Sequence, residues 1–85
     1  MNATEWLGMV AGTLSSITFL PQVIKTWQSK STKDISLWMF LIVTASVVLW
    51  LVYGILLKST PIIYTNSMVL LMSLVMLYFK LIRFK

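Results

Sequence analysis

The chain has 85 residues, of which 59% are hydrophobic and 11% charged, and its mean hydropathy is +0.91. Soluble domains carry about 25% charged residues, and a chain this short cannot bury so much apolar surface in water. Since it lacks cysteine and histidine, disulfide scaffolds, Cys/His metal sites and a Ser-His-Asp triad are excluded. The net charge of +5 comes from cations between and after the apolar runs, which is typical of membrane proteins. We therefore predict one integral membrane domain over residues 1–85, with no cofactor, no metal and no nucleic-acid partner.

Three uncharged runs occupy residues 6–24, 35–57 and 59–79. Each approaches the roughly 20 residues that a helix needs to cross a bilayer, and none alternates with the period of two that barrel strands show. We predict an all-α protein with helices over about 5–25, 35–57 and 61–80, a basic loop over 25–34 and a basic tail to residue 85. The first run is expected to remain in the chain, because no Lys or Arg precedes it and no A-x-A cleavage site follows it.

The first predicted helix carries two features of its own. Gly8, Gly12 and Ser16 form a ridge of small residues at four-residue spacing, which allows another helix to approach closely. A pore-lining role for Ser15 or Ser16 is the alternative. Pro21 cannot donate to the carbonyl of Ile17, so we predict a kink about one turn before the end of this helix.

The connections carry cap signals and set the orientation. Asp34 or Ser36 is suited to cap the second helix, and Thr60 before Pro61 is suited to begin the third. The basic loop and the tail hold six cations on one side of the membrane, against Lys58 alone on the other. We predict a plasma (inner) membrane protein with its N-terminus outside and with the loop and the C-terminus in the cytoplasm. Every copy should insert the same way, so that a homodimer would be parallel; the six cations are Lys25, Lys30, Lys33, Lys80, Arg83 and Lys85.

Trp50 and Asn66 are polar or aromatic residues well inside the second and third runs. Counting eight residues either way from Lys58, both lie roughly 12 Å in from the outer turn, at the same depth. An indole face and a carboxamide at one level suit a neutral, polyhydroxylated ligand. The alternatives are a buried structural tryptophan and an interhelical hydrogen bond from the asparagine.

The three runs contain no Asp, Glu, His, Lys or Arg. Proton relays and ion-coupled sites place ionisable groups within the membrane, and a charged substrate needs a counter-ion there. We therefore expect a neutral cargo that moves down its own gradient. An enzyme is not expected, because no general acid, general base or metal-binding set exists within the spans.

Four segments together give the chain a family resemblance. It resembles the SemiSWEETs, the bacterial three-helix relatives of SWEET sugar transporters within the PQ-loop superfamily. The resemblance spans nearly the whole chain, and the segments that carry it are Phe19-Leu20-Pro21-Gln22, Ser31-Thr32-Lys33-Asp34-Ile35-Ser36, Trp50-Leu51-Val52-Tyr53-Gly54 and Asn66. It implies a homodimer of triple-helix bundles with helix order 1-3-2, in which a sugar binds centrally between the protomers.

The resemblance also implies roles for individual residues. Trp50 and Asn66 would bind the sugar, and Pro21 with Gln22 would form the hinge for alternating access. Tyr53 matches an outer gate position and Met39 an inner one. At the outer turn, where relatives often carry an Arg and an Asp that latch the gate, this chain has Leu57 and Ser59, so a charged latch is in doubt.

The predicted function is facilitative transport of small neutral mono- or disaccharides by alternating access. Three helices of about 10 Å diameter leave no interior wide enough for a hexose, which independently favours a dimer surrounded by lipid. Two alternatives stay open. One is a PQ-loop carrier of another metabolite such as an amino acid, and the other is a structural or regulatory membrane subunit that transports nothing.

Overall fold

The computed structural model describes residues 1–84, so that Lys85, one of the six cations counted above, lies outside the described residues. Three helices long and apolar enough to cross a membrane run over Ala3–Ser29, Leu37–Leu57 and Thr60–Arg83, as predicted. The first is divided in two and the last ends in a π-helical turn, which gives five segments: α1 (Ala3–Ile17), α2 (Leu20–Ser29), α3 (Leu37–Leu57), α4 (Thr60–Tyr78) and η1 (Phe79–Arg83).

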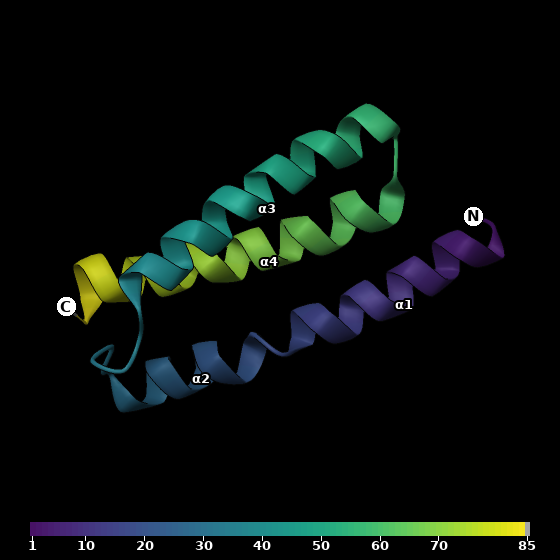
Figure 1. Cartoon of the computed structure of the whole chain (residues 1–85). Coiled ribbons are helices and arrows are strands. Elements are labelled where there is room, and N and C mark those ends of the chain that lie inside the picture. The colour runs from purple at the N-terminus through teal and green to yellow at the C-terminus, as the bar shows by residue number, and fades with distance from the viewer. Residues whose placement is uncertain (85) are drawn as a thin grey trace.

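The first helix is interrupted where Pro21 predicts it. The N–H groups of Thr18 and Phe19 bond to carbonyls three residues back, at 3.3 and 3.1 Å, which tightens the end of α1. Pro21 then occupies the first turn of α2, where its missing N–H leaves no bond broken within that helix. The interruption is visible as a bend in the ribbon between α1 and α2 (Figure 1).

The helix ends differ from the predicted ones by a few residues. Ser36, and not Asp34, caps α3, because its Oγ accepts a hydrogen bond from the Met39 N–H at 3.1 Å. The predicted cap at Thr60 is wrong by one residue: Ser59 is the N-cap of α4, since Lys58 turns left-handed (φ 56°) and Ser59 is already extended.

The first span also continues beyond the predicted boundary near residue 25. The apolar run stops at Ile24, but α2 continues as a helix to Ser29. It ends where Lys30 adopts a left-handed conformation (φ 55°) and donates its N–H to the Thr26 carbonyl at 2.9 Å. Hydropathy marks the membrane boundary, whereas backbone geometry marks the helix end, and these two points need not coincide.

Helix α4 lies between α1 and α3 (Figure 1), which is the order 1-3-2. The ridge of small residues on α1 packs against α4. A methyl group on Gly12 would overlap Thr65, one on Gly8 would lie 3.1 Å from the Pro61 Cβ, and the Ser16 Oγ contacts the Thr65 carbonyl at 3.4 Å. The ridge is therefore a helix-packing surface, and Ser16 is fully buried in it.

Helices α3 and α4 pack along their whole length. Near the turn that joins them, a Cβ on Gly54 would lie 2.6 Å from the Ile62 Cγ2. Further along, the hydroxyls of Thr44 and Ser73 share a hydrogen bond of 2.9 Å. At the far end a core cluster forms, made of Phe40, Met76 and Phe79.

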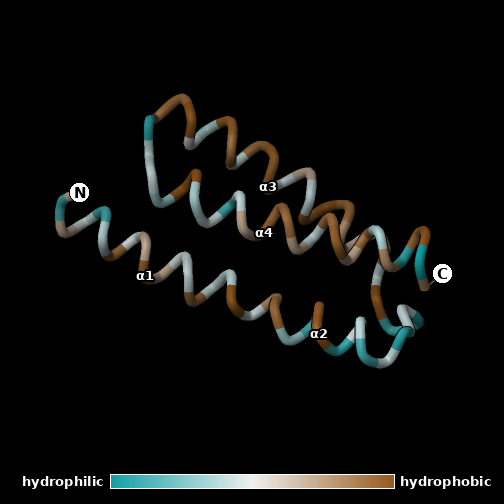
Figure 2. The backbone as a smooth tube through the Cα atoms, turned by 180° about the vertical axis from the view of Figure 1, so that it is seen from behind, coloured by the Kyte–Doolittle hydropathy of each residue, from teal (hydrophilic) through white to brown (hydrophobic). Residues whose placement is uncertain are grey.

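Hydrophilic residues gather at the two ends of the bundle (Figure 2). One end holds the α2–α3 connection, called loop 1 below (residues 30–36), together with the C-terminal segment. We call this the basic end. Between the ends the surface is mostly apolar, with Leu49 71% and Leu56 77% exposed. A surface of this kind must be covered by lipid or by another protein.

A candidate binding site on α3 and α4

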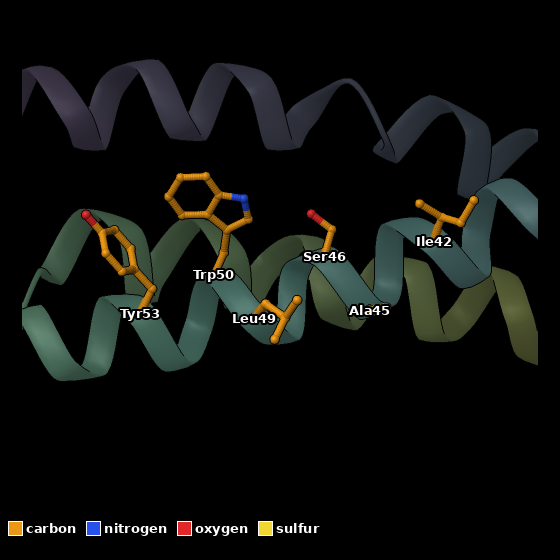
Figure 3. A pocket seen from close by; sticks show the side chains of 6 residues that line it. All are labelled: Ile42, Ala45, Ser46, Leu49, Trp50 and Tyr53. Atoms are coloured by element: carbon orange, nitrogen blue, oxygen red, sulfur yellow. The ribbon is translucent and has the colours of Figure 1, made fainter.

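One face of α3 lines a cavity of about 550 Å³. The lining side chains recur every three or four residues, so they project from a single stripe of the helix. In Figure 3, Ile42, Ser46 and Trp50 point from α3 toward the side of the bundle on which α1 and α2 lie. All the lining residues belong to α3, and they are Ile42, Ala45, Ser46, Leu49, Trp50 and Tyr53.

Trp50 is 51% exposed and therefore is not a buried structural residue within its own chain. Its ring meets Tyr53 edge-on, with the centroids 5.5 Å apart and the planes at 82°. An edge-to-face contact covers at most one face of the indole, so at least one flat face stays free of Tyr53. Trp50 thus presents a flat, apolar ring face to the cavity.

Asn66 lies half-buried on α4. Its Nδ2 donates to the Ile62 carbonyl at 2.9 Å, one turn back along the same helix. This is the single hydrogen bond of the Asn66 side chain within residues 1–84, so the interhelical bond that the sequence leaves open does not form there. The amide oxygen keeps its capacity to accept hydrogen bonds.

The contact between Gly54 and Ile62 brings Trp50 and Asn66 to one level. Trp50 precedes Gly54 by four residues on α3, and Asn66 follows Ile62 by four residues on α4. Because the two helices are antiparallel, both side chains lie about one turn, roughly 6 Å, from that contact on the same side of it. The structure therefore agrees with the equal depth that their spacing from Lys58 predicts.

Gln22 belongs to a second cavity, of about 330 Å³, at the basic end. The exposed Pro21 beside it is not among the lining residues. The walls come from α2, loop 1 and α4, and consist of Gln22, Lys25, Thr26, Ser29, Ser31, Lys33, Asp34, Ile35 and Met76. This cavity is far more polar than the one on α3, since most of its lining side chains carry hydroxyl, amide or charged groups.

The two residues assigned to gates lie on opposite sides of Trp50. Tyr53 is three residues nearer the α3–α4 turn and contacts the indole directly. Met39 lies on the first turn of α3 at the basic end, where it is 46% exposed. The structure thus joins Tyr53 to Trp50 and places Gln22 and Met39 apart from them.

Two further polar groups were not singled out from the sequence. Ser46 lines the α3 cavity one turn from Trp50, and this i, i+4 relation to a tryptophan is a signal that the sequence does contain. The Thr44–Ser73 hydrogen bond joins residues 29 positions apart, and no local sequence pattern predicts it. Within the described residues, no group of three acidic, His or Cys side chains is placed to hold a metal ion.

The comparisons with known proteins agree with this architecture. The model of the PQ loop repeat family matches residues 3–63. A sugar transporter SemiSWEET of Leptospira biflexa is 44% identical over 75 residues, 88% of either chain, and one of Bradyrhizobium diazoefficiens is 37% identical over 67 residues, 79% of this chain and 78% of the relative. The crystal structure of a bacterial homologue of SWEET transporters matches with a TM-score of 0.92 at 31% identity, covering 99% of this chain and 100% of the other. The similarity therefore extends over the entire fold.

Proposed function

This chain belongs to the SemiSWEET family of PQ-loop proteins, and from that premise we propose that it carries small neutral sugars across the membrane by facilitated diffusion. The observation that carries the proposal is that Trp50 and Asn66 lie at one level on two adjoining helices, with Trp50 lining the α3 cavity and Asn66 outside that lining. The open indole face packs on the C–H face of a sugar ring, and the free amide oxygen accepts hydrogen bonds from its hydroxyls. No charged side chain lies on α3 between Leu37 and Leu57, which suits an uncharged cargo.

The binding chamber is completed by a second copy of the chain. The α3 cavity is walled by one helix alone, and Trp50 and Tyr53 are each about half exposed beside it. A two-fold partner supplies the missing wall and presents each pocket residue twice around the path. The lipid of the bilayer then covers the remaining apolar surface.

The orientation follows from charge. The basic end carries Lys25, Lys30, Lys33, Lys80 and Arg83, whereas the α3–α4 turn carries Lys58. Cations of short loops stay in the cytoplasm, so the basic end faces the cytoplasm and the N-terminus lies outside the plasma (inner) membrane. Both protomers share this orientation, which makes the dimer parallel.

Alternating access uses the break between α1 and α2. Pro21 keeps the two segments from joining into one rigid helix, so α2 pivots while α1 stays packed on α4. Gln22 travels with α2 at the wall of the cytoplasmic cavity. Met39 constricts the path on the cytoplasmic side of Trp50, and Tyr53 constricts it on the outer side.

Flux of radiolabelled mono- and disaccharides into proteoliposomes tests this function. Trp50→Ala and Asn66→Ala should each lower the uptake by about 5- to 150-fold, since each removes contacts worth about 1–3 kcal/mol. Trp38→Ala and Ser67→Ala are the matched controls: Trp38 is on α3 outside the cavity, Ser67 is the neighbour of Asn66, and both should leave uptake unchanged.

Three results of this assay would contradict the proposal. Uptake by the Trp50 and Asn66 variants at the parental rate would mean that the pocket is elsewhere. Faster uptake of an amino acid than of any sugar would indicate a carrier for zwitterions. If the purified parent protein moved no solute at all, a structural or regulatory role would be favoured.

A further inference from the structure

Two hydrogen bonds join loop 1 to the C-terminal segment. The Thr32 hydroxyl donates to the Phe84 carbonyl at 2.6 Å, and the Lys80 Nζ donates to the Thr32 carbonyl at 2.8 Å. Thr32 is only 3% exposed, although it lies in a polar loop whose neighbouring residues Ser31 and Lys33 are exposed. The centre of loop 1 is therefore fixed by residues that lie about fifty positions further along the chain.

Aromatic contacts attach α2 to the same segment. The Trp27 ring lies 5.9 Å from Phe79 and 6.4 Å from Phe84, and the two phenylalanines are 5.1 Å apart. Phe79 is almost fully buried in the core cluster, so it anchors this aromatic group to α3 and α4. We call residues 79–84 the C-terminal strap.

The strap owes its shape to the π-helical turn. Its last N–H, that of Phe84, bonds to the Phe79 carbonyl at 2.7 Å. This wider turn brings the Phe84 carbonyl to the Thr32 hydroxyl and the Lys80 Nζ to the Thr32 carbonyl. Turns of this width are found at the C-terminal ends of helices.

What the strap holds is the wall of the cavity at the basic end. Ser31, Lys33 and Asp34 line that cavity and flank Thr32 in the sequence. Gln22 and Lys25 line it from α2, the segment that the break at Thr18 and Phe19 separates from α1. A movement of α2 or loop 1 that opens this cavity must therefore strain or break the contacts to the strap.

We infer that the C-terminal strap fastens α2 and loop 1 at the basic end and so sets the balance between the two access states of the carrier, with Thr32 and Lys80 as its positioning residues. The effect on transport rests on the proposed function, whereas the fastening itself does not. A contact made in one conformation and lost in the other shifts the equilibrium by its own free energy. Loss of either hydrogen bond should shift that equilibrium about tenfold.

A single introduced cysteine reports on the fastening, because the chain has none of its own. Val23 lies on α2, partly buried against Phe40, Met76 and Phe79, so that Val23→Cys is shielded while α2 is held in place. In vesicles, Thr32→Val and Lys80→Met should raise its rate of reaction with a small maleimide about tenfold. Thr32→Ser and Lys80→Arg keep a donor at each position and should restore slow labelling.

Lys30→Met is the matched control. Like Lys80→Met, it removes one positive charge from the basic end. In the part of the chain that the structure describes, the Lys30 side chain makes no hydrogen bond. Its labelling rate should equal that of the parent. If Thr32→Val and Lys80→Met label no faster than Lys30→Met, the strap does not hold α2 and the inference is wrong.

Sugar kinetics separate a conformational effect from a loss of folded protein. A shift between access states changes the half-saturation concentrations on the two membrane sides in opposite directions, because each side binds sugar only in its own state. Damage to folding lowers the maximal rate and leaves both half-saturation concentrations in place, which would overturn the positioning role. If labelling responds but the parent protein carries no sugar, the strap stands and the proposed function falls.

Discussion

In the proposed site, Trp50 and Asn66 would bind the sugar through the groups that their own contacts leave free. Tyr53 meets the indole edge to face, and the Ile62 carbonyl accepts one amide hydrogen of Asn66, so each side chain is oriented by a neighbour on its own helix. The flat indole face and the amide oxygen remain available. A binding group that is already held in place loses little conformational entropy when its ligand arrives.

Gly54 allows α3 and α4 to approach each other closely. Gly54→Ala should lower the free energy of unfolding by about 1–3 kcal/mol, because the added Cβ would lie 2.6 Å from the Ile62 Cγ2. Thermal unfolding in detergent measures the loss. The double variant Gly54→Ala/Ile62→Ala removes the clash and should recover part of it, and a double variant no more stable than expected from adding the two single effects would contradict the contact.

At the scale of the helices, the two halves of the first span are attached to the rest of the bundle in different ways. Helix α1 is packed on α4 through Gly8, Gly12 and Ser16, so tightly that a methyl group on Gly12 would overlap Thr65. Helix α2 begins after the interruption and is attached through Val23, which packs on the core cluster, and through Trp27, which meets the strap. A first span divided in this way can move its half at the basic end without unpacking the other half.

Pro21→Ala tests the division of the first span. Proline in a helix interior costs about 3 kcal/mol, so alanine should favour a continuous helix by a comparable amount. Flux into proteoliposomes should then fall about tenfold or more, since 1.36 kcal/mol changes a rate tenfold. Pro61→Ala is the control, because Pro61 lies in the first turn of α4 and interrupts nothing. Equal flux in the Pro21 variant and the parent would show that transport does not need a hinge at Pro21.

At the scale of the whole molecule, the single chain leaves much of its apolar surface uncovered. Within residues 1–84 the buried apolar side chains are few, namely Phe40, Val47, Pro61, Met76 and Phe79, while large aliphatic and aromatic residues remain exposed along each span. The open cavity on α3 has one wall. Lipid accounts for the outward surface, and the proposed two-fold partner accounts for the half-exposed Trp50 and Tyr53.

Cross-linking from the α3 cavity tests the dimer. Ser46→Cys places a thiol in the cavity lining, and in a parallel two-fold dimer the same residue of both protomers lies at one depth. A bifunctional maleimide should convert most of the protein to a covalent dimer in vesicles. Ile55→Cys, on α3 but outside the cavity lining and 60% exposed, should remain largely monomeric. Monomeric Ser46→Cys protein after treatment would contradict the shared chamber.

The charge distribution of the whole chain predicts uncoupled transport. The acidic residues, Glu5 and Asp34, lie at the first turn of α1 and in loop 1, away from the middle of the spans. A proton-coupled carrier needs an ionisable group within the membrane. Sugar uptake should therefore be the same with and without an imposed pH gradient, and marked acceleration by the gradient would show that the transport is proton-coupled.

Several features could be predicted from the amino-acid sequence alone: the three spans, the interruption near Pro21, the packing ridge of Gly8, Gly12 and Ser16, and the common depth of Trp50 and Asn66. These are local properties, because hydropathy, a missing N–H group and residue spacing act within one helix. The hydrogen-bond partners of the buried polar groups become known only from the folded chain, in which Thr32 is buried against Phe84 and Thr44 bonds to Ser73. Such contacts join residues far apart in the chain, and no periodicity within either segment specifies the partner. The order of the helices, likewise, was implied by family resemblance and is explained physically only by the close contacts that Gly12 and Gly54 permit on two sides of α4.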